Sequence, residues 1–189
     1  MSLLAAASCS RNPTPFRRLA IPPANILIDD DSFDWLKTGI PIILQQDLSA
    51  AKGTAATIVP SDSAAFAIQA TGIAAVTVTR QTSGFVVDVV LRDAATQRTT
   101  DAFRTSEPED VITAIDIAAK YVDAAAVPFS THNLMALRAY LDAIDSRDLP
   151  FAIHRLQDAL SADPHFTAAQ TALQRAQKRA ASPEAPVVR

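Results

Sequence analysis

Two central segments of the chain alternate between apolar and polar residues with a period of two. In the first, Val76 and Val78 alternate with Thr77 and Thr79. In the second, one face carries Phe85, Val87, Val89 and Leu91, and the opposite face carries Val86, Asp88, Val90 and Arg92. This alternation predicts two half-buried β-strands, and the Gln-Thr-Ser-Gly sequence at 81–84 predicts a hairpin between them. Residues 97–104 form a weaker, threonine-rich strand whose polar pattern suits an exposed sheet edge.

The first part of the chain predicts further strands and helices. Residues 19–28, interrupted by Pro22 and Pro23, predict a strand at the edge or end of a sheet, and residues 54–59 predict another. Apolar residues at helical spacing predict a helical turn over 32–38, a helix over 40–51 and a short helix over 62–69. The first two are separated because proline, here Pro41, is not tolerated in the middle of a helix. We expect Gly53 to end the second of these helices in the left-handed conformation.

Ser106 and Glu109 have the spacing of a capping box, which predicts the start of a long helix. The apolar stripe of that helix runs from Val111 to Val122. The predicted order of elements is therefore β-α-β-α-β-β-β-α. This order predicts an α/β (α+β) fold, with a mixed sheet of about five strands and helices packed on it.

Four stretches of residues 18–127 follow a recognisable pattern. They are Arg18–Pro23 with Asn25, Phe33–Leu36 with Gly39 and Ile40, Val76–Arg80, and Val86–Ala94. Together they resemble the amino-terminal α/β domain of TolB, and related domains that precede tetratricopeptide repeats in bacterial cyclases and regulators. The resemblance implies one domain over 18–127, and it consists of strand and turn patterns rather than reactive residues. Pro23 replaces a usual aromatic and Gln97 replaces the turn glycine, so we expect an open or longer turn at Gln97.

Residues 128–181 are predicted to form three helices, separated by a polar turn at 145–148 and by Asp163-Pro164. The pattern of Ala152, Leu156, Ala159 and Pro164 resembles the second helix of a tetratricopeptide repeat, although Tyr140 occupies a place that usually holds a small residue. The resemblance implies a helical hairpin plus one helix. Repeat arrays need about three units for a continuous core. This segment must therefore dock on the α/β domain, pair with a second chain or take up a partner helix. Residues 182–189 are predicted to be a disordered tail.

Composition and motifs argue against several kinds of chemistry. The net charge of −3 provides no basic field for nucleic acid, and four glycines do not form a phosphate-binding loop. The three histidines, His132, His154 and His165, lack the spacing of a helical zinc pair. The acidic run 29–31 is expected to be a solvated turn and helix cap. We therefore expect no catalytic residues, no metal and no cofactor, so the protein is not predicted to be an enzyme.

Residues 1–17 contain the most informative short motif. Leu3–Ser8, apolar or small, precede Cys9, the one cysteine of the chain. This resembles the end of a bacterial lipoprotein signal, whose cysteine is lipidated after cleavage, and residues 10–17 then form a tether. A signal also needs a basic start and about 7–15 apolar residues. Either translation therefore starts upstream of Met1, or the motif is accidental. Ser10, rather than Asp, implies sorting to the outer membrane.

These observations leave two functional hypotheses. The first is a lipid-anchored adaptor on the periplasmic side of the bacterial cell envelope, which contacts other envelope proteins and reaches the membrane through Cys9. Its expected partner surface comprises Thr99 and Thr100 on the edge strand, with Tyr140 and Leu156 in the incomplete repeat. The second is a ligand-binding sensor of a periplasmic regulatory system. That hypothesis requires a sizeable pocket with convergent polar groups.

Overall fold

The computed structural model describes residues 16–106 and 108–181. Cys9, residues 10–15 of the predicted tether and the predicted tail 182–189 lie outside the described residues, whereas Arg17, the last residue of the predicted tether, begins strand β1 of the sheet. The strands are β1 (Arg17–Ile21), β2 (Asn25–Leu27), β3 (Thr54–Ile58), β4 (Gly72–Gln81), β5 (Gly84–Asp93) and β6 (Thr99–Arg104). The helices are α1 (Leu36–Leu48), α2 (Ala64–Ala67), α3 (Val111–Val122), α4 (Leu134–Asp145), α5 (Leu149–Ala162) and α6 (Thr167–Ala181), with a 3₁₀ turn at Asp31–Phe33.

The predicted fold class is confirmed. The strands form one six-stranded mixed sheet in the order β3-β1-β4-β5-β6, and β2 also pairs with β4. The pairs β1/β3, β1/β4 and β2/β4 are parallel, whereas β4/β5 and β5/β6 are antiparallel. The proline pair after β1 divides the first predicted strand into β1 and β2, because proline cannot donate to the ladder.

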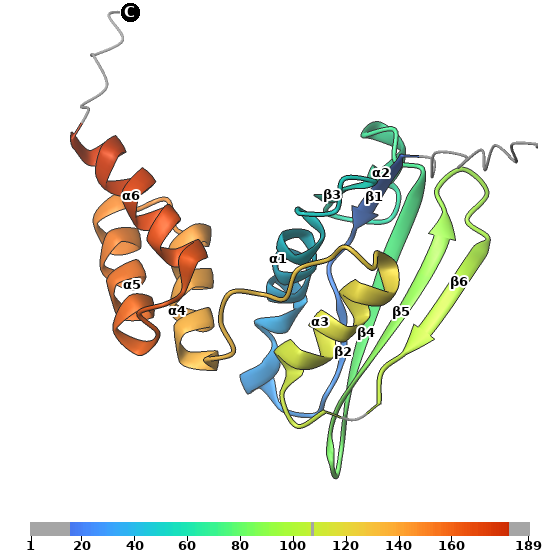
Figure 1. Cartoon of the computed structure of the whole chain (residues 1–189), viewed down its shortest axis with the longest axis horizontal. Coiled ribbons are helices and arrows are strands. Elements are labelled where there is room, and N and C mark those ends of the chain that lie inside the picture. The colour runs from blue at the N-terminus through green and yellow to red at the C-terminus, as the bar shows by residue number, and fades with distance from the viewer. Residues whose placement is uncertain (1–15, 107, 182–189) are drawn as a thin grey trace, which may run out of the picture.

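Helices α1 and α3 cover one face of the sheet (Figure 1). The alternation in β5 turns Val87, Val89 and Leu91 toward these helices, where all three are buried. On the opposite face, a small cluster of Ala20, Val59, Ala65 and Ile73 lies beneath α2. The sheet therefore has its main core on the α1–α3 side.

The predicted break before Pro41 is wrong, because α1 runs continuously through it. Proline has no N–H, so the Lys37 carbonyl four residues earlier has no helical donor. That carbonyl instead accepts a hydrogen bond from the Ala24 backbone N–H at 3.0 Å. A contact from a distant segment thus satisfies the group that would otherwise favour ending the helix.

Three other local predictions, on the cap of α3 and on the backbone at Gly53 and Gln97, can be compared with the structure. The cap of α3 is Asp110, whose carboxylate accepts from the Ile112 and Thr113 backbone N–H groups, rather than a box formed by Ser106 and Glu109. Gly53 does not have the predicted positive φ. Gln97 does, at 57°, so it adopts the left-handed turn conformation despite its side chain. Its N–H donates to the Asp93 carbonyl at 2.9 Å, closing the turn.

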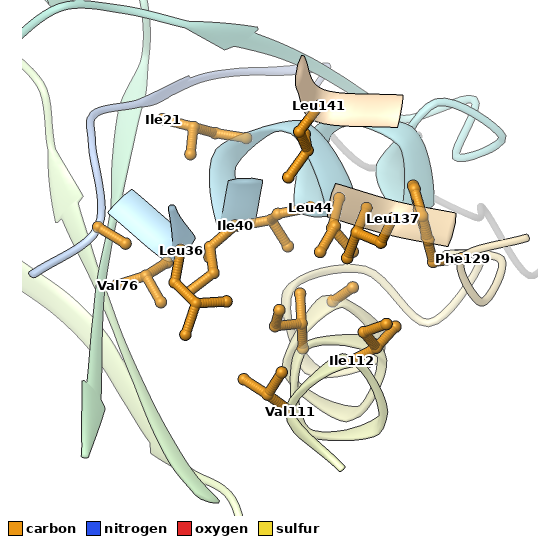
Figure 2. Close-up of a cluster of buried hydrophobic side chains, with 14 of the residues drawn as sticks. Ile21, Leu36, Ile40, Leu44, Val76, Val111, Ile112, Phe129, Leu137 and Leu141 are labelled. Carbon is orange, nitrogen blue, oxygen red and sulfur yellow. The ribbon is translucent and has the colours of Figure 1, made fainter. Parts of the chain in front are cut away.

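The three C-terminal helices dock on the α/β domain, which was one of the three predicted alternatives. Leu137 and Leu141 of α4 point toward Ile40 and Leu44 of α1, with Phe129 alongside (Figure 2). A single hydrophobic cluster extends from the sheet through these residues to Phe166 beside α6. The α/β domain and the C-terminal helices α4–α6, which are the two halves of the chain, therefore share one core. Among the described residues, no helix is both long and apolar enough to cross a membrane.

Candidate functional site

The predicted surface on the edge strand is exposed, but the backbone of that strand is irregular. Thr99 and Thr100 lie on β6, the edge strand beside β5, and both are exposed. On β6 the Ala102 backbone N–H donates to the Asp101 carboxylate at 2.9 Å, and the register of β5 with β6 shifts between Leu91 and Arg92. Bulges, charges and occupied N–H groups discourage strand addition. This edge therefore provides polar side chains rather than a free backbone template.

The other two predicted surface residues are buried in the chain's own core. Tyr140 is 7% exposed and its ring lies 5.0 Å from the ring of Phe166. Leu156 of α5 is 3% exposed. Phe166 covers the ring of Tyr140, and α4 and α6 pack against α5, the helix that carries Leu156. Neither side chain therefore offers the broad exposed surface that was predicted.

The three histidines do not converge. His154 lies near Asp158 on α5 at 3.3 Å, and His165 precedes α6. His132 lies in the segment between α3 and α4. Within residues 16–106 and 108–181, no group of His, Cys, Asp and Glu side chains has the arrangement of a metal site.

An open groove of about 410 Å³ lies where the two halves of the chain meet. We call it the junction groove. Its walls are the end of α1, the start of the segment between α3 and α4, and one side of α6. The lining residues are Gln46, Asp47, Ser49, Ala50, Val127, Pro128, Phe129, Ser130, Tyr140, Thr167, Ala168, Thr171, Ala172 and Arg175. Each half contributes one wall, so the groove exists only in the docked arrangement.

Polar groups of both halves meet in the junction groove. The Gln46 side chain on α1 donates to the Tyr140 hydroxyl on α4 at 2.9 Å. Burial raises the pKa of that hydroxyl, against the effect of Gln46 and of the positive charge of Arg175. Thr171 and Arg175 lie one turn apart on α6 and line the same wall. Hydroxyl, amide and guanidinium groups thus lie beside an apolar floor.

A group of titratable residues lies behind the segment 123–133, which we call the linker. We call this group the carboxyl cluster: Asp47 of α1, Asp110 and Asp116 at α3, and His132 of the linker. Asp116 accepts from the Phe129 backbone N–H at 3.1 Å and lies 3.2 Å from His132 Nε2. The other ring nitrogen, Nδ1, lies 3.0 Å from the Asp110 carboxylate. His132 therefore bridges two carboxylates of α3.

Asp47 is the unusual member of the carboxyl cluster. It is 1% exposed, and no donor in the described structure reaches either oxygen of its carboxyl group. Burial, the negative charge of Asp116 and a hydrogen bond to Asp116 raise the pKa of Asp47 to about 9. Asp47 is therefore protonated at neutral pH, and its proton provides the donor that Asp116 can accept.

The other two carboxyls respond to different surroundings. Burial also raises the pKa of Asp116, against the stabilising bond from the Phe129 N–H and the proximity of His132. Burial opposes ionisation of Asp110 as well. However, hydrogen bonds from the Thr113 N–H and hydroxyl, from His132 and from the Ile112 N–H outweigh it and lower the pKa of Asp110. The cluster thus combines one ionised cap with a buried pair that resists ionisation.

The sequence reasoning missed Gln46, Asp47, Asp116 and Arg175. Two of them carried a detectable signal, because Asp47 and Asp116 fall on the buried stripes of their helices. Asp47 follows Leu44 by three residues, and Asp116 follows Ile112 by four. An acid at a core position is rarely buried without a partner. Gln46 and Arg175 lie outside those stripes, and no comparable pattern marks them.

Comparisons with known proteins give weak similarities. No family model matches the chain, and no curated protein matches it. One similar solved structure is TolB from Acinetobacter baumannii, at TM-score 0.41 and 18% identity, covering 58% of this chain and 27% of that chain. The matched region thus spans about a quarter of TolB. The expected likeness to TolB is therefore present, but weak.

Two further structures are similar over a comparable share of this chain. One is a dodecamer of a PelC variant from Paraburkholderia phytofirmans, at TM-score 0.44 and 14% identity, covering 59% of this chain and 90% of that chain. The other is a neuraminyllactose-binding hemagglutinin homolog from Helicobacter pylori, at TM-score 0.32 and 11% identity, covering 59% and 84%.

Proposed function

We propose that this protein is a non-catalytic, lipid-anchored adaptor of the bacterial envelope, and that its junction groove holds a segment of a partner protein. The observation that carries the proposal is the groove itself. Both halves of the chain build it, and both belong to one continuous core. Sites at the contact between two structural units are frequent places for binding.

The groove's composition suits a segment of polypeptide. Its apolar floor includes Val127, a residue that is 53% exposed, and Pro128. Thr171 and Arg175 add a hydroxyl and a cation along one wall. A partner segment can bury apolar side chains on the floor while its backbone and an acidic side chain bond to that wall.

The envelope location rests on the sequence around Cys9. Small and apolar residues precede the cysteine and a proline-containing stretch follows it. Two or more acyl chains on one cysteine give stable membrane anchoring, whereas a single chain does not. A Cys9→Ala variant should therefore leave the membrane fraction. Retention of that variant in the membrane would contradict the anchor.

A photo-crosslinking residue in place of Thr171 tests the partner proposal. Thr171 is exposed and lines the groove, whereas Gln177, on another side of the same helix, is exposed and outside it. In cells that produce the full chain, the probe at 171 should yield one discrete protein adduct. The probe at 177 should not yield it. Adducts of equal intensity at both positions, or none at 171, would refute a partner in the groove.

The same groove also favours the sensor hypothesis as a second candidate. Its volume of about 410 Å³ lies in the range of small-molecule sites, and polar groups converge in it. However, such sites usually enclose most of the ligand surface, and this groove is open along one side. A small-molecule ligand would raise the melting temperature of the purified protein without any protein adduct at 171.

A further inference from the structure

The linker is held to the α/β domain by the carboxyl cluster. The Val127 backbone N–H donates to the Asp47 backbone carbonyl at 2.9 Å, and the Phe129 N–H donates to the Asp116 carboxylate at 3.1 Å. Three residues later, His132 bridges Asp116 and Asp110. These contacts lie immediately before α4, so they fix where the C-terminal helices leave the sheet domain.

Whether Asp47 carries a proton determines whether the contacts between the linker and the α/β domain are favourable. With Asp47 ionised, two buried carboxylates face each other and Asp47 has no donor. Asp47 also lies in the last turn of α1, where the helix dipole disfavours negative charge. With Asp47 protonated, the pair carries one charge and shares one hydrogen bond. The docked arrangement therefore holds a proton that a solvent-exposed Asp47 would release.

We propose that the carboxyl cluster is a pH-dependent latch, which docks helices α4–α6 on the α/β domain when Asp47 is protonated and releases them as the pH rises. Release would uncover Phe129, Leu137 and Tyr140, and it would dismantle the junction groove. The latch concerns the chain alone and does not depend on the groove having a partner.

Other charged groups near the latch do not replace the missing donor. Tyr140 of α4 and Arg175 of α6 line the same groove as Asp47. The Tyr140 hydroxyl accepts a hydrogen bond from Gln46, and neither residue bonds to the Asp47 carboxyl oxygens. At the other end, Asp123 accepts from the Thr54 hydroxyl at 2.7 Å. Lys120, on α3, is exposed. The His132 ring lies 3.2 Å from the Asp116 carboxylate and 3.0 Å from that of Asp110, and it therefore ties the linker to α3.

The direction of the pH effect follows from proton linkage. Asp47 binds a proton more tightly in the docked form than in the released form, where its pKa returns to the ordinary carboxyl value. Between that value and about 9, each rise of one pH unit should weaken docking by up to about tenfold. The window includes pH 5 to 8.

Hydrogen exchange of the full chain, corrected for the intrinsic pH dependence of exchange, tests the latch. Between pH 5 and 8, protection of α4–α6 amides should fall by up to about tenfold per unit, while β4 and β5 stay protected. Trp35, the one tryptophan of the chain, adjoins Leu141 and Ile144 of α4. Its emission should shift toward that of an exposed indole over the same range.

Two isosteric variants separate the latch from general instability. Asp47→Asn should remove the pH dependence of α4–α6 protection, because an amide does not titrate. Asp88→Asn on β5, whose carboxylate pairs with Arg104 on the sheet, should keep the wild-type dependence. An unchanged pH dependence in Asp47→Asn would overturn the proposal.

If Asp47→Asn does not fold, measurements on the wild type and on a third variant still test the latch. Parallel loss of protection in the wild-type α4–α6 helices and β4–β5 strands would show global unfolding instead of release, and would also overturn the latch. His132→Gln removes the ring that bridges Asp110 and Asp116. It should lower α4–α6 protection at pH 5, and unchanged protection there would count against the bridge.

Discussion

At the scale of single residues, Gly39 shows how closely α4 approaches α1. A Cβ atom added at Gly39 would lie 2.8 Å from Leu141 Cδ1 and 3.0 Å from Trp35 Cε3. Neighbours at these distances must move. The absence of a side chain at position 39 is therefore a packing requirement of the contact between the two halves.

Gly39→Val should lower the free energy of unfolding by about 1–3 kcal/mol, because its extra atoms overfill the contact with Leu141. Denaturant unfolding measures the change. Gly53→Ala is the matched control, since a Cβ there meets no atom within 4 Å. The control should stay within about 1 kcal/mol of the wild type. Equal losses of stability in both variants would show that the effect at Gly39 does not come from the contact with Leu141.

At the scale of elements, the start of α3 depends on one side chain. The Asp110 carboxylate accepts from the Ile112 N–H at 3.2 Å and from the Thr113 N–H at 2.9 Å. The same carboxylate faces His132 of the linker. The N-terminus of this helix and one end of the linker are thus fixed together.

Asp110→Ala should cost about 1–2 kcal/mol of stability at pH 7, through loss of the cap. Ser106→Ala should change stability little, because Ser106 is exposed and does not cap α3. The pKa of Asp110 is lowered in the folded state, so its contribution is present above the ordinary carboxyl range and is lost as the pH falls through the folded value. Denaturation series at pH 7 and pH 3 should therefore show a smaller Asp110→Ala effect in acid.

At the scale of the whole molecule, the contact between the halves is part of the core. Leu137 of α4 is fully buried, in the same cluster as Leu44 of α1 and Ile112 of α3 (Figure 2). The three C-terminal helices are therefore stabilised by packing against the α/β domain.

Leu137→Ala should lower the free energy of unfolding by about 2–5 kcal/mol, because it leaves a cavity between the halves. Circular dichroism during denaturation at pH 5 would measure it, where the latch keeps the helices docked. Leu134→Ala, on the same helix but 37% exposed, should cost less than about 1 kcal/mol. Similar values for the two variants would mean that α4 does not contribute its buried face to a shared core.

Periodicity along the chain was sufficient to predict the mixed sheet and most of its elements. The period-two pattern of Val76–Thr79 and the helical stripe of Val111–Val122 each report which side of one element is buried, and that property is local. The left-handed conformation of Gln97 was harder to predict from the sequence, because the geometry of the turn overrides the preference of a non-glycine residue for negative φ.

The features that the sequence pattern did not predict depend on contacts between distant segments of the chain. Pro41 stays inside α1 because Ala24, far away in the sequence, bonds to the Lys37 carbonyl. Tyr140 is buried because the ring of Phe166 packs on it, and Leu156 is buried because α4 and α6 pack on its helix. Asp47 was visible as an acid on an apolar stripe, but its neighbours Asp116 and His132 come from other elements. Local sequence determines which face of an element is apolar, whereas only the assembled core decides what covers that face and which charges it brings together.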